Sequence, residues 1–258
     1  MPAVDHFPST HATWIDAQLT IAEDADRAHA AGDALAASRA AGARNALRRH
    51  VMERYTGALG AYVSSSGLRS AGERDELVAG FYAGPLADDA FLARWRTSGM
   101  PLRRWLMNAI AFHCRGLRRD ARRERARTEP GDVQALDAAG AGLTQGAAGA
   151  AEADAAEAFD RAWALAIVNE SYARVQAELA DAGRHDDDAI LRMHLVDGMP
   201  YEEIAHRLGL TRTECFNATR RVAARVRESL RELLREEGVP NSGLDAAVGE
   251  VMRLVARG

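Results

Sequence analysis

Eleven arginines between positions 94 and 127 are the densest set of chemically specific side chains in the sequence. Only Asp120 and Glu124 oppose them, so this segment carries a local net charge of +9. The chain has no lysine, and arginine binds phosphate oxygens through paired N–H donors. Like charges at this density repel one another unless an outside anion neutralises them. The block therefore predicts a phosphate-binding surface, with a solvated arginine face as the alternative.

A second arginine-rich segment lies at 199–226, MPYEEIAHRLGLTRTECFNATRRVAARV. Ile204, Ala205 and Leu208 have helical spacing and predict a short helix with one apolar face. Gly209 follows at once and can take the left-handed conformation that ends a helix and turns the chain. The segment therefore predicts two short helical pieces that meet at a single glycine.

The second helix of this pair begins near Thr211 or Thr213, either of which can cap it, and Glu214 helps to complete its first turn. One face is predicted to be buried: Cys215, Thr219, Val222 and Val226. The other face carries Arg212, Thr213, Phe216, Asn217, Arg220 and Arg221. This pattern is typical of a helix-turn-helix, whose second helix enters the major groove of DNA. A plain helical hairpin is the alternative.

Catalytic and metal-binding patterns are missing from the sequence. The eight histidines are scattered, and neither CxxC nor HExxH occurs. Glu202 and Glu203 are adjacent, so they lie on different sides of a helix and form no catalytic pair. Cys114 and Cys215 are isolated and are expected to be small apolar fillers in a reducing compartment. We therefore expect no enzymatic activity, cofactor or metal, and the absence of a secretory signal or membrane span favours the cytoplasm.

The elements that position these side chains are predicted to be helices, because Ala, Arg and Leu dominate and alternating β-branched runs are scarce. Between 134 and 158 the chain is almost all Ala, Gly and small polar residues, which predicts a flexible acidic linker. The expected organisation is a partly helical extension at 1–44, a helical domain at 45–127, the linker at 128–156, a helix-turn-helix domain at 157–237, and a tail with a short helix at 238–258.

Three segments together resemble a known family. YEEIAHRLGL, at 201–210, is similar to the signature of region four of bacterial sigma factors of the extracytoplasmic function group, in the sigma-70 family. ERDELVAGFYAGPLADDAFLARW, at 73–95, is similar to the acidic segment of sigma region two. PLRRWLMNAIAFHCRGLRRDARRERAR, at 101–127, is similar to the segment that handles the −10 element. The resemblance implies an all-α chain with a region 2-like helical bundle and a region 4-like helix-turn-helix.

The resemblance also implies a function. Such a protein binds the RNA polymerase core through its β and β′ subunits, recognises the −35 and −10 promoter elements, captures the melted strand, and works at the nucleoid without catalysis of its own. The implied −35 contacts are Arg212, Thr213, Glu214, Phe216, Asn217, Arg220 and Arg221. The implied −10 contacts are Arg103, Arg104, Asn108, His113, Arg115, Arg118, Arg119, Arg122 and Arg123. The implied polymerase contacts are Asp75, Glu76, Leu77 and Phe81.

Within the −10 set, Gly116 is predicted to interrupt the helix, so that His113 and Arg115 line a loop that receives a flipped base. The linker is expected either to thread through polymerase as a nucleic-acid mimic or to act as an inert tether. An anti-sigma protein or a kinase stays open as a regulator.

Several residues depart from the family pattern: Ala79, Gly80, His113, Phe216 and Ala218. Because of these departures, the strength of the polymerase contact and the preferred −10 and −35 sequences do not follow from the resemblance. The alternative function is a helix-turn-helix transcriptional regulator that does not act as a sigma subunit. That alternative explains the second domain but gives the basic block of the first domain no purpose. A helical enzyme is a weaker alternative, because no catalytic set supports it.

Overall fold

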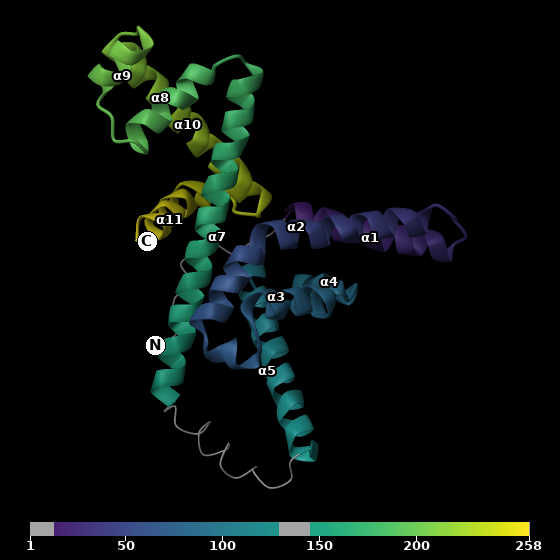
Figure 1. The fold of residues 1–258 in the computed structure, drawn as a ribbon. Coiled ribbons are helices and arrows are strands. Elements are labelled where there is room, and N and C mark those ends of the chain that lie inside the picture. Colours follow the sequence, from purple (N-terminus) through teal and green to yellow (C-terminus); the bar gives the residue numbers. More distant parts are fainter. Residues whose placement is uncertain (1–12, 129–144, 258) are drawn as a thin grey trace. The chain divides into compact units, whose positions relative to one another are not determined.

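The computed structural model describes residues 13–128 and 145–257, and within these ranges every regular element is a helix (Figure 1). The all-α class is confirmed for this part of the chain. The start of the expected N-terminal extension, the part of the expected linker at 129–144, and Gly258 lie outside the described residues. None of the described helices combines the length and the apolar character that a membrane span requires.

The described chain divides into two compact units. One comprises residues 13–128, 145–164 and 254–257, and the other is Leu165–Arg253. The division falls inside helix α7 (Gln145–Asp181). Residues 145–156, which the sequence places in the linker, instead form the start of this helix. Alanine is the strongest helix former, and Ala155 is fully buried in the first unit.

The first unit is built from the helices that precede α7. They are α1 (Thr13–Ala30), α2 (Ala36–Ser65), α3 (Arg74–Ala83), α4 (Ala90–Ser98) and α5 (Leu102–Thr128), with short 3₁₀ turns at Gly67–Ala71 and Pro85–Ala87. Helices α1 and α2 lie side by side as a hairpin (Figure 1). The core beneath them is formed by side chains with almost no exposed surface: Tyr55 and Leu59 of α2, Phe81 of α3, and Leu106 and Ile110 of α5.

Helix α5, which carries most of the basic block, is fixed against the first half of α7. The guanidinium of Arg103 is ion-paired with Asp160 and lies over the ring of Trp163, 4.6 Å from its centre. The ring of Phe159 stacks on that of Tyr55, with 6.3 Å between centres. Both Phe159 and Trp163 are buried. These contacts leave the opposite side of α5 facing solvent.

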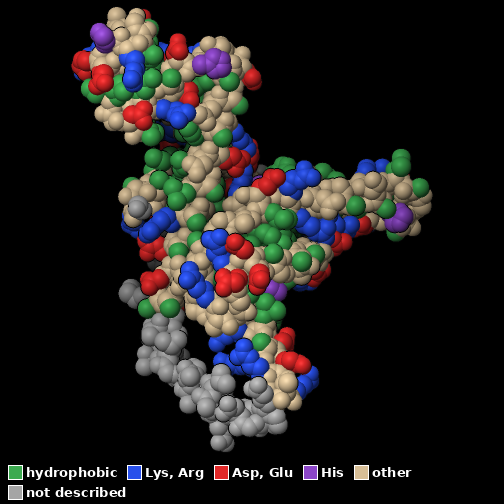
Figure 2. Space-filling view, viewed as in Figure 1, with side chains coloured by type: hydrophobic (Ala, Val, Ile, Leu, Met, Phe, Trp, Pro, Cys, Tyr) green, Lys and Arg blue, Asp and Glu red, His purple; other side chains and the backbone are tan. Residues whose placement is uncertain are grey.

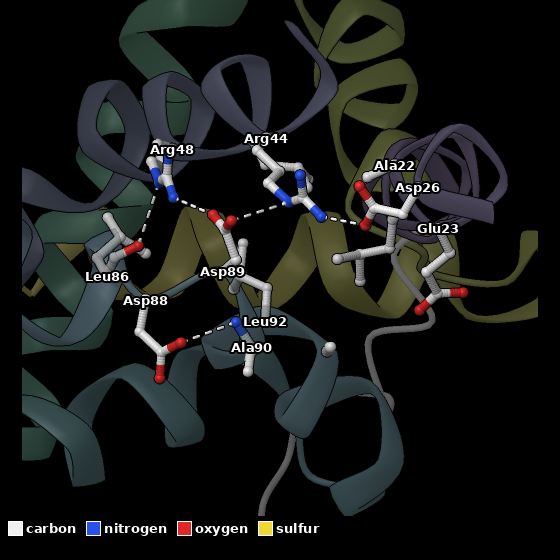
Figure 3. Close-up of a pocket in the computed structure, with 13 residues that line it drawn as sticks. Ala22, Glu23, Asp26, Arg44, Arg48, Leu86, Asp88, Asp89, Ala90 and Leu92 are labelled. Carbon is white, nitrogen blue, oxygen red and sulfur yellow. Dashed lines mark hydrogen bonds and ion pairs between the residues drawn. The ribbon is translucent and has the colours of Figure 1, made fainter. Parts of the chain in front are cut away.

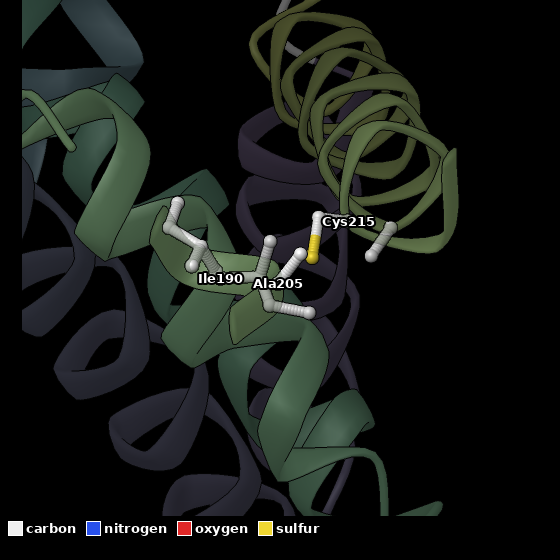
Figure 4. Close-up of a cluster of buried hydrophobic side chains, with 5 residues drawn as sticks. Ile190, Ala205 and Cys215 are labelled. Carbon is white, nitrogen blue, oxygen red and sulfur yellow. The ribbon is translucent and has the colours of Figure 1, made fainter. Parts of the chain in front are cut away.

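The second unit contains the two helices that meet at Gly209. After the second half of α7 come α8 (His185–Leu195), α9 (Tyr201–Leu208), α10 (Arg212–Glu236), a 3₁₀ turn at Asn241–Gly243, and most of α11 (Leu244–Ala256). A compact apolar cluster joins α8, α9 and α10 (Figure 4): Ile190, Ile204, Ala205, Cys215 and Ala218. Helix α9 contributes Ile204 and Ala205 to this cluster, as their spacing predicts.

Candidate nucleic-acid interface

The turn between α9 and α10 sets the direction of α10. Gly209 has φ +67°, in the left-handed region, and the backbone N–H of Leu210 donates to the carbonyl of Ala205 at 2.9 Å. Thr211 is the N-cap of α10: its hydroxyl accepts from the N–H of Glu214 at 3.2 Å, and its own N–H donates to the Glu214 carboxylate at 2.7 Å. The predicted cap is therefore confirmed as Thr211, in a reciprocal capping box.

The two faces of α10 separate as its sequence predicts. Cys215, Thr219 and Val222 are buried, and Val226 is half-buried. All the residues implied for the −35 element face solvent: Arg212, Thr213, Glu214, Phe216, Asn217, Arg220 and Arg221. Since the inner face packs on α8 and α9, this exposed side is the one that α10 presents to a ligand.

Some of the exposed side chains of α10 already have a polar partner within the fold. The carboxylate of Glu214 holds the N-cap, and the hydrogen bond from the Thr211 backbone lowers its pKa. Arg212 is 2.7 Å from Glu202, and Arg221 is 3.3 Å from Asp187. The role that the structure gives Glu214 is therefore to cap the start of α10. Arg212 and Arg221 would exchange an intramolecular carboxylate for a phosphate or a base edge.

Phe216 belongs to an aromatic row at the surface of the second unit. Its ring meets Tyr201 edge-on at 5.8 Å, and Tyr201 stacks on His194 at 3.9 Å. The guanidinium of Arg220 lies 5.7 Å from the Phe216 ring. Phe216 remains 45% exposed, so it supports Arg220 and still presents an apolar edge that could contact a thymine methyl group. The contacts with Tyr201 and Arg220 therefore hold the Phe216 ring in place at the surface.

Helix α5 presents a second basic face. Phe112, Arg115, Arg119 and Arg122 recur at three- and four-residue intervals, so they share one side of the helix. Together with Arg118 they line a depression of about 410 Å³. No described carboxylate lies within ion-pairing distance of these four arginines. Figure 2 shows blue arginine side chains over this part of the molecule. Within the described part of the chain these four cations therefore have no paired counter-charge.

Phe112 is the residue that sequence reasoning missed. Its ring is 69% exposed, and Arg119 lies 5.9 Å from its centre. Aromatic residues at helical spacing are usually buried, and Trp95 of the same segment is. The spacing in the sequence could have identified it, because Phe112 lies three and seven residues before Arg115 and Arg119 and therefore on the same side of the helix. An exposed ring among arginines is suited to stack on an unpaired base.

Three expectations for the −10 set are corrected. Helix α5 runs unbroken through Gly116, so no loop forms there. Arg103 is buried in its contacts with α7 and does not face solvent. His113 points inward toward α3, so it does not line a surface pocket. Of the other implied residues, Arg104, Asn108 and Arg123 are exposed, and Arg123 is 3.6 Å from Asp120.

His113 is wedged against helix α3. Its ring packs edge-on to Phe81 at 6.3 Å between centres, and Nε2 is buried without a described hydrogen-bond partner. A Cβ atom at Gly80 would come within 3.2 Å of Nε2. Burial lowers the pKa of His113 below its ordinary value. The absence of a side chain at Gly80 therefore leaves room for the His113 ring.

This burial makes stability depend on pH. Because the pKa of His113 is lower in the folded chain, the unfolded chain takes up this proton first as pH falls. The His113 contribution is present above about pH 6.5, the ordinary pKa of histidine, and is lost as pH falls toward the lowered value. We expect His113→Gln to flatten the decrease in unfolding free energy between about pH 7.5 and 5.5, measured by urea titration. The exposed His29→Gln is the control, and equal slopes for both variants and wild type would contradict this account.

The implied polymerase contacts divide between surface and core. Asp75 and Glu76 are exposed on the first turn of α3, and Arg74 lies 2.7 Å from Asp75, whose pKa its hydrogen bond lowers. Leu77 and Phe81 are 2% and 0% exposed, so they belong to the core of the first unit. A partner could therefore contact the two carboxylates but not these two apolar side chains.

A second hollow of the first unit, about 270 Å³ in volume, lies between α1, α2 and α4 (Figure 3). Arg44 bridges Asp26 of α1 and Asp89, and Arg48 pairs with Asp89 and donates to the carbonyl of Ala87 at 2.7 Å. The cations here are matched by carboxylates within the fold. These contacts attach α1 to the rest of the unit.

Comparisons of the chain with family models, with curated proteins and with solved structures find no match.

Proposed function

We propose that the chain is a sigma factor of the extracytoplasmic function type, which binds the RNA polymerase core and directs it to promoters. The observation that carries the proposal is that the chain has two separate basic helix faces, on α10 and on α5, which suit different forms of nucleic acid. Helix α10 offers a capped recognition helix of a helix-turn-helix, whereas α5 offers arginines with no described carboxylate partner around an exposed aromatic ring. Duplex recognition and single-strand capture need these two kinds of surface.

In this proposal α10 holds the −35 duplex in its major groove. Arg212, Asn217 and Arg220 lie on the exposed side, within its first three turns. Arginine can bind guanine through two hydrogen bonds and asparagine can bind adenine in the same way. The neighbouring Arg221 is placed to neutralise a phosphate. Thr211 and Glu214 contribute by fixing the start of the helix rather than by reading bases.

Helix α5 captures the melted strand of the −10 element in the same proposal. Arg115, Arg118, Arg119 and Arg122 neutralise backbone phosphates, and Phe112 stacks on an unpaired base. Phe112 takes the role that the family resemblance implies for His113, because His113 faces α3. Asp75 and Glu76 are the remaining contacts for polymerase. The protein would work in the cytoplasm, at the nucleoid, and the bond-forming chemistry would be that of polymerase.

The proposal is tested by transcription with purified components. The full chain is added to core polymerase with a library of random promoters, and the transcripts are sequenced. We expect transcripts that begin at defined positions downstream of a shared pair of elements, and retention of the chain on core polymerase without DNA. A chain that binds DNA but is never retained on core polymerase would instead be a helix-turn-helix regulator.

A double variant, Arg212→Ala/Arg220→Ala, tests the recognition helix in the same assay. Loss of a bidentate base contact costs about 1–3 kcal/mol, so we expect at least about a tenfold loss of binding to the selected −35 duplex, with core retention unchanged. Arg253→Ala, an exposed arginine of α11, is the control. Unchanged duplex binding by the double variant would reject the assignment of α10.

A further inference from the structure

An apolar cavity of about 400 Å³ lies within the second unit, between α7, α8, α10 and α11. Most of its lining side chains are aliphatic, and they include Leu191, Leu195, Val226, Leu230, Val248 and Met252. Leu195 and Met252 are 66% and 51% exposed. The volume of the cavity falls within the range of about 300–1,000 Å³ that is usual for small-molecule sites, and such sites are lined mostly by apolar side chains.

Two cations stand in the lining of this cavity. Arg192 belongs to α8 and Arg227 to α10, both are exposed, and neither has a described carboxylate within ion-pairing distance. The two hydroxyls of the lining already have partners: that of Ser171 donates to the carbonyl of Ile167 at 2.8 Å, and that of Tyr172 donates to Asp188 at 2.6 Å. Burial, helped by this hydrogen bond, raises the pKa of Tyr172 to about 12. No carboxylate stands among the residues that line the cavity, so the two charges in its lining are both positive.

We propose that this cavity binds a medium-chain aliphatic carboxylate, with its hydrocarbon chain between α8, α10 and α11 and its carboxylate at Arg192 and Arg227. The aliphatic lining excludes a strongly polar ligand, and the two arginines disfavour a cationic amphiphile. The site involves none of the residues assigned to DNA on α10, so it does not depend on the proposed function. A ligand that contacts several helices at once stabilises the folded unit by mass action.

Binding is measured by calorimetry on the full chain with decanoate, octanoate, decanol and decyltrimethylammonium. We expect saturable binding of decanoate at one site and a rise in melting temperature. Burial of one methylene contributes about 0.8 kcal/mol, so octanoate should bind about 15-fold more weakly than decanoate. Decanol should bind more weakly than decanoate, and decyltrimethylammonium most weakly. Equal binding of the anion and the cation would overturn the proposal.

Matched variants locate the site. Ala223 lines the cavity from the exposed surface of α10, and the adjacent Ala224 is also exposed but does not line it. We expect Ala223→Trp to abolish decanoate binding and Ala224→Trp to leave it unchanged. Arg192→Gln/Arg227→Gln should weaken decanoate about tenfold, since each exposed ion pair contributes modestly, without affecting decanol. Arg207→Gln is the charge control. Decanoate binding that survives Ala223→Trp, in a variant that keeps its circular dichroism spectrum, would reject the site.

Discussion

Replacement of Arg118, Arg119 and Arg122 by alanine is expected to abolish promoter opening while leaving the chain bound to core polymerase. These arginines lie on α5 with no described carboxylate partner, so a nucleic-acid strand would supply their counter-charge. Each phosphate neutralised on a single strand contributes about 0.7 to the dependence of log affinity on log salt concentration. The triple variant should therefore flatten this slope by about 2.

The measurement pairs two assays. Permanganate reactivity of unpaired thymines reports promoter opening, and titration with a −10 single strand at several salt concentrations gives the slope. Arg27→Ala/Arg39→Ala/Arg69→Ala removes the same charge from exposed positions on α1, α2 and the first 3₁₀ turn, so it controls for net charge. Normal opening by the α5 variant would make its arginines a solvated face. Loss of core binding would overturn the separation of the two surfaces.

Loss of the Asp160 carboxylate is expected to destabilise the first unit by about 2–3 kcal/mol, because it removes the carboxylate that pairs with the buried guanidinium of Arg103. The Arg103 side chain is 9% exposed, whereas that of Asp160 is 29% exposed, so the cost falls below that of a fully buried pair. Urea unfolding of Asp160→Ala gives the value. The matched control is Glu157→Ala on the same helix, because that side chain is 49% exposed. Equal destabilisation by the two variants would contradict this account of the Arg103 pair.

The double variant Arg103→Met/Asp160→Leu distinguishes a structural role of Arg103, in the ion pair with Asp160, from a role in binding the −10 strand. Replacing both charges with apolar groups removes the buried cation together with its partner, so most of the lost stability should return. Single-strand affinity should stay near the wild-type value, since Arg103 does not face solvent. A large loss of strand affinity in a stable double variant would indicate that Arg103 contacts the strand.

The two helices that meet at Gly209 could be predicted because their signals are local. Gly209 ends one helix through its own backbone conformation, and Thr211 and Glu214 satisfy each other within four residues. The alternation of apolar and polar positions on α10 then determines which side is buried. All of this information lies within one short segment, so sequence alone was sufficient for the exposed residues of α10.

Other parts of the site depend on contacts that local patterns do not contain. Gly116 costs a helix about 1 kcal/mol relative to alanine, and the helix-forming residues on both sides of it outweigh that cost. Arg103 belongs to a basic run, and only its contact with α7 shows that it is buried. Leu77 and Phe81 share the α3 segment with two exposed acids, so their motif cannot separate core from surface. The linker prediction was wrong at the start of α7, because alanine, whose small side chain buries little area, also favours helix.

The close approach of His113 to Gly80 limits the order in which these two positions could have changed during evolution. Alanine at position 80 would favour the α3 helix by about 1 kcal/mol, but its Cβ would crowd the His113 ring at 3.2 Å. A shorter side chain at position 113 would remove that obstacle. We therefore expect the two positions to be epistatic: a larger residue at 80 should be better tolerated after His113 has been replaced by a shorter side chain than before.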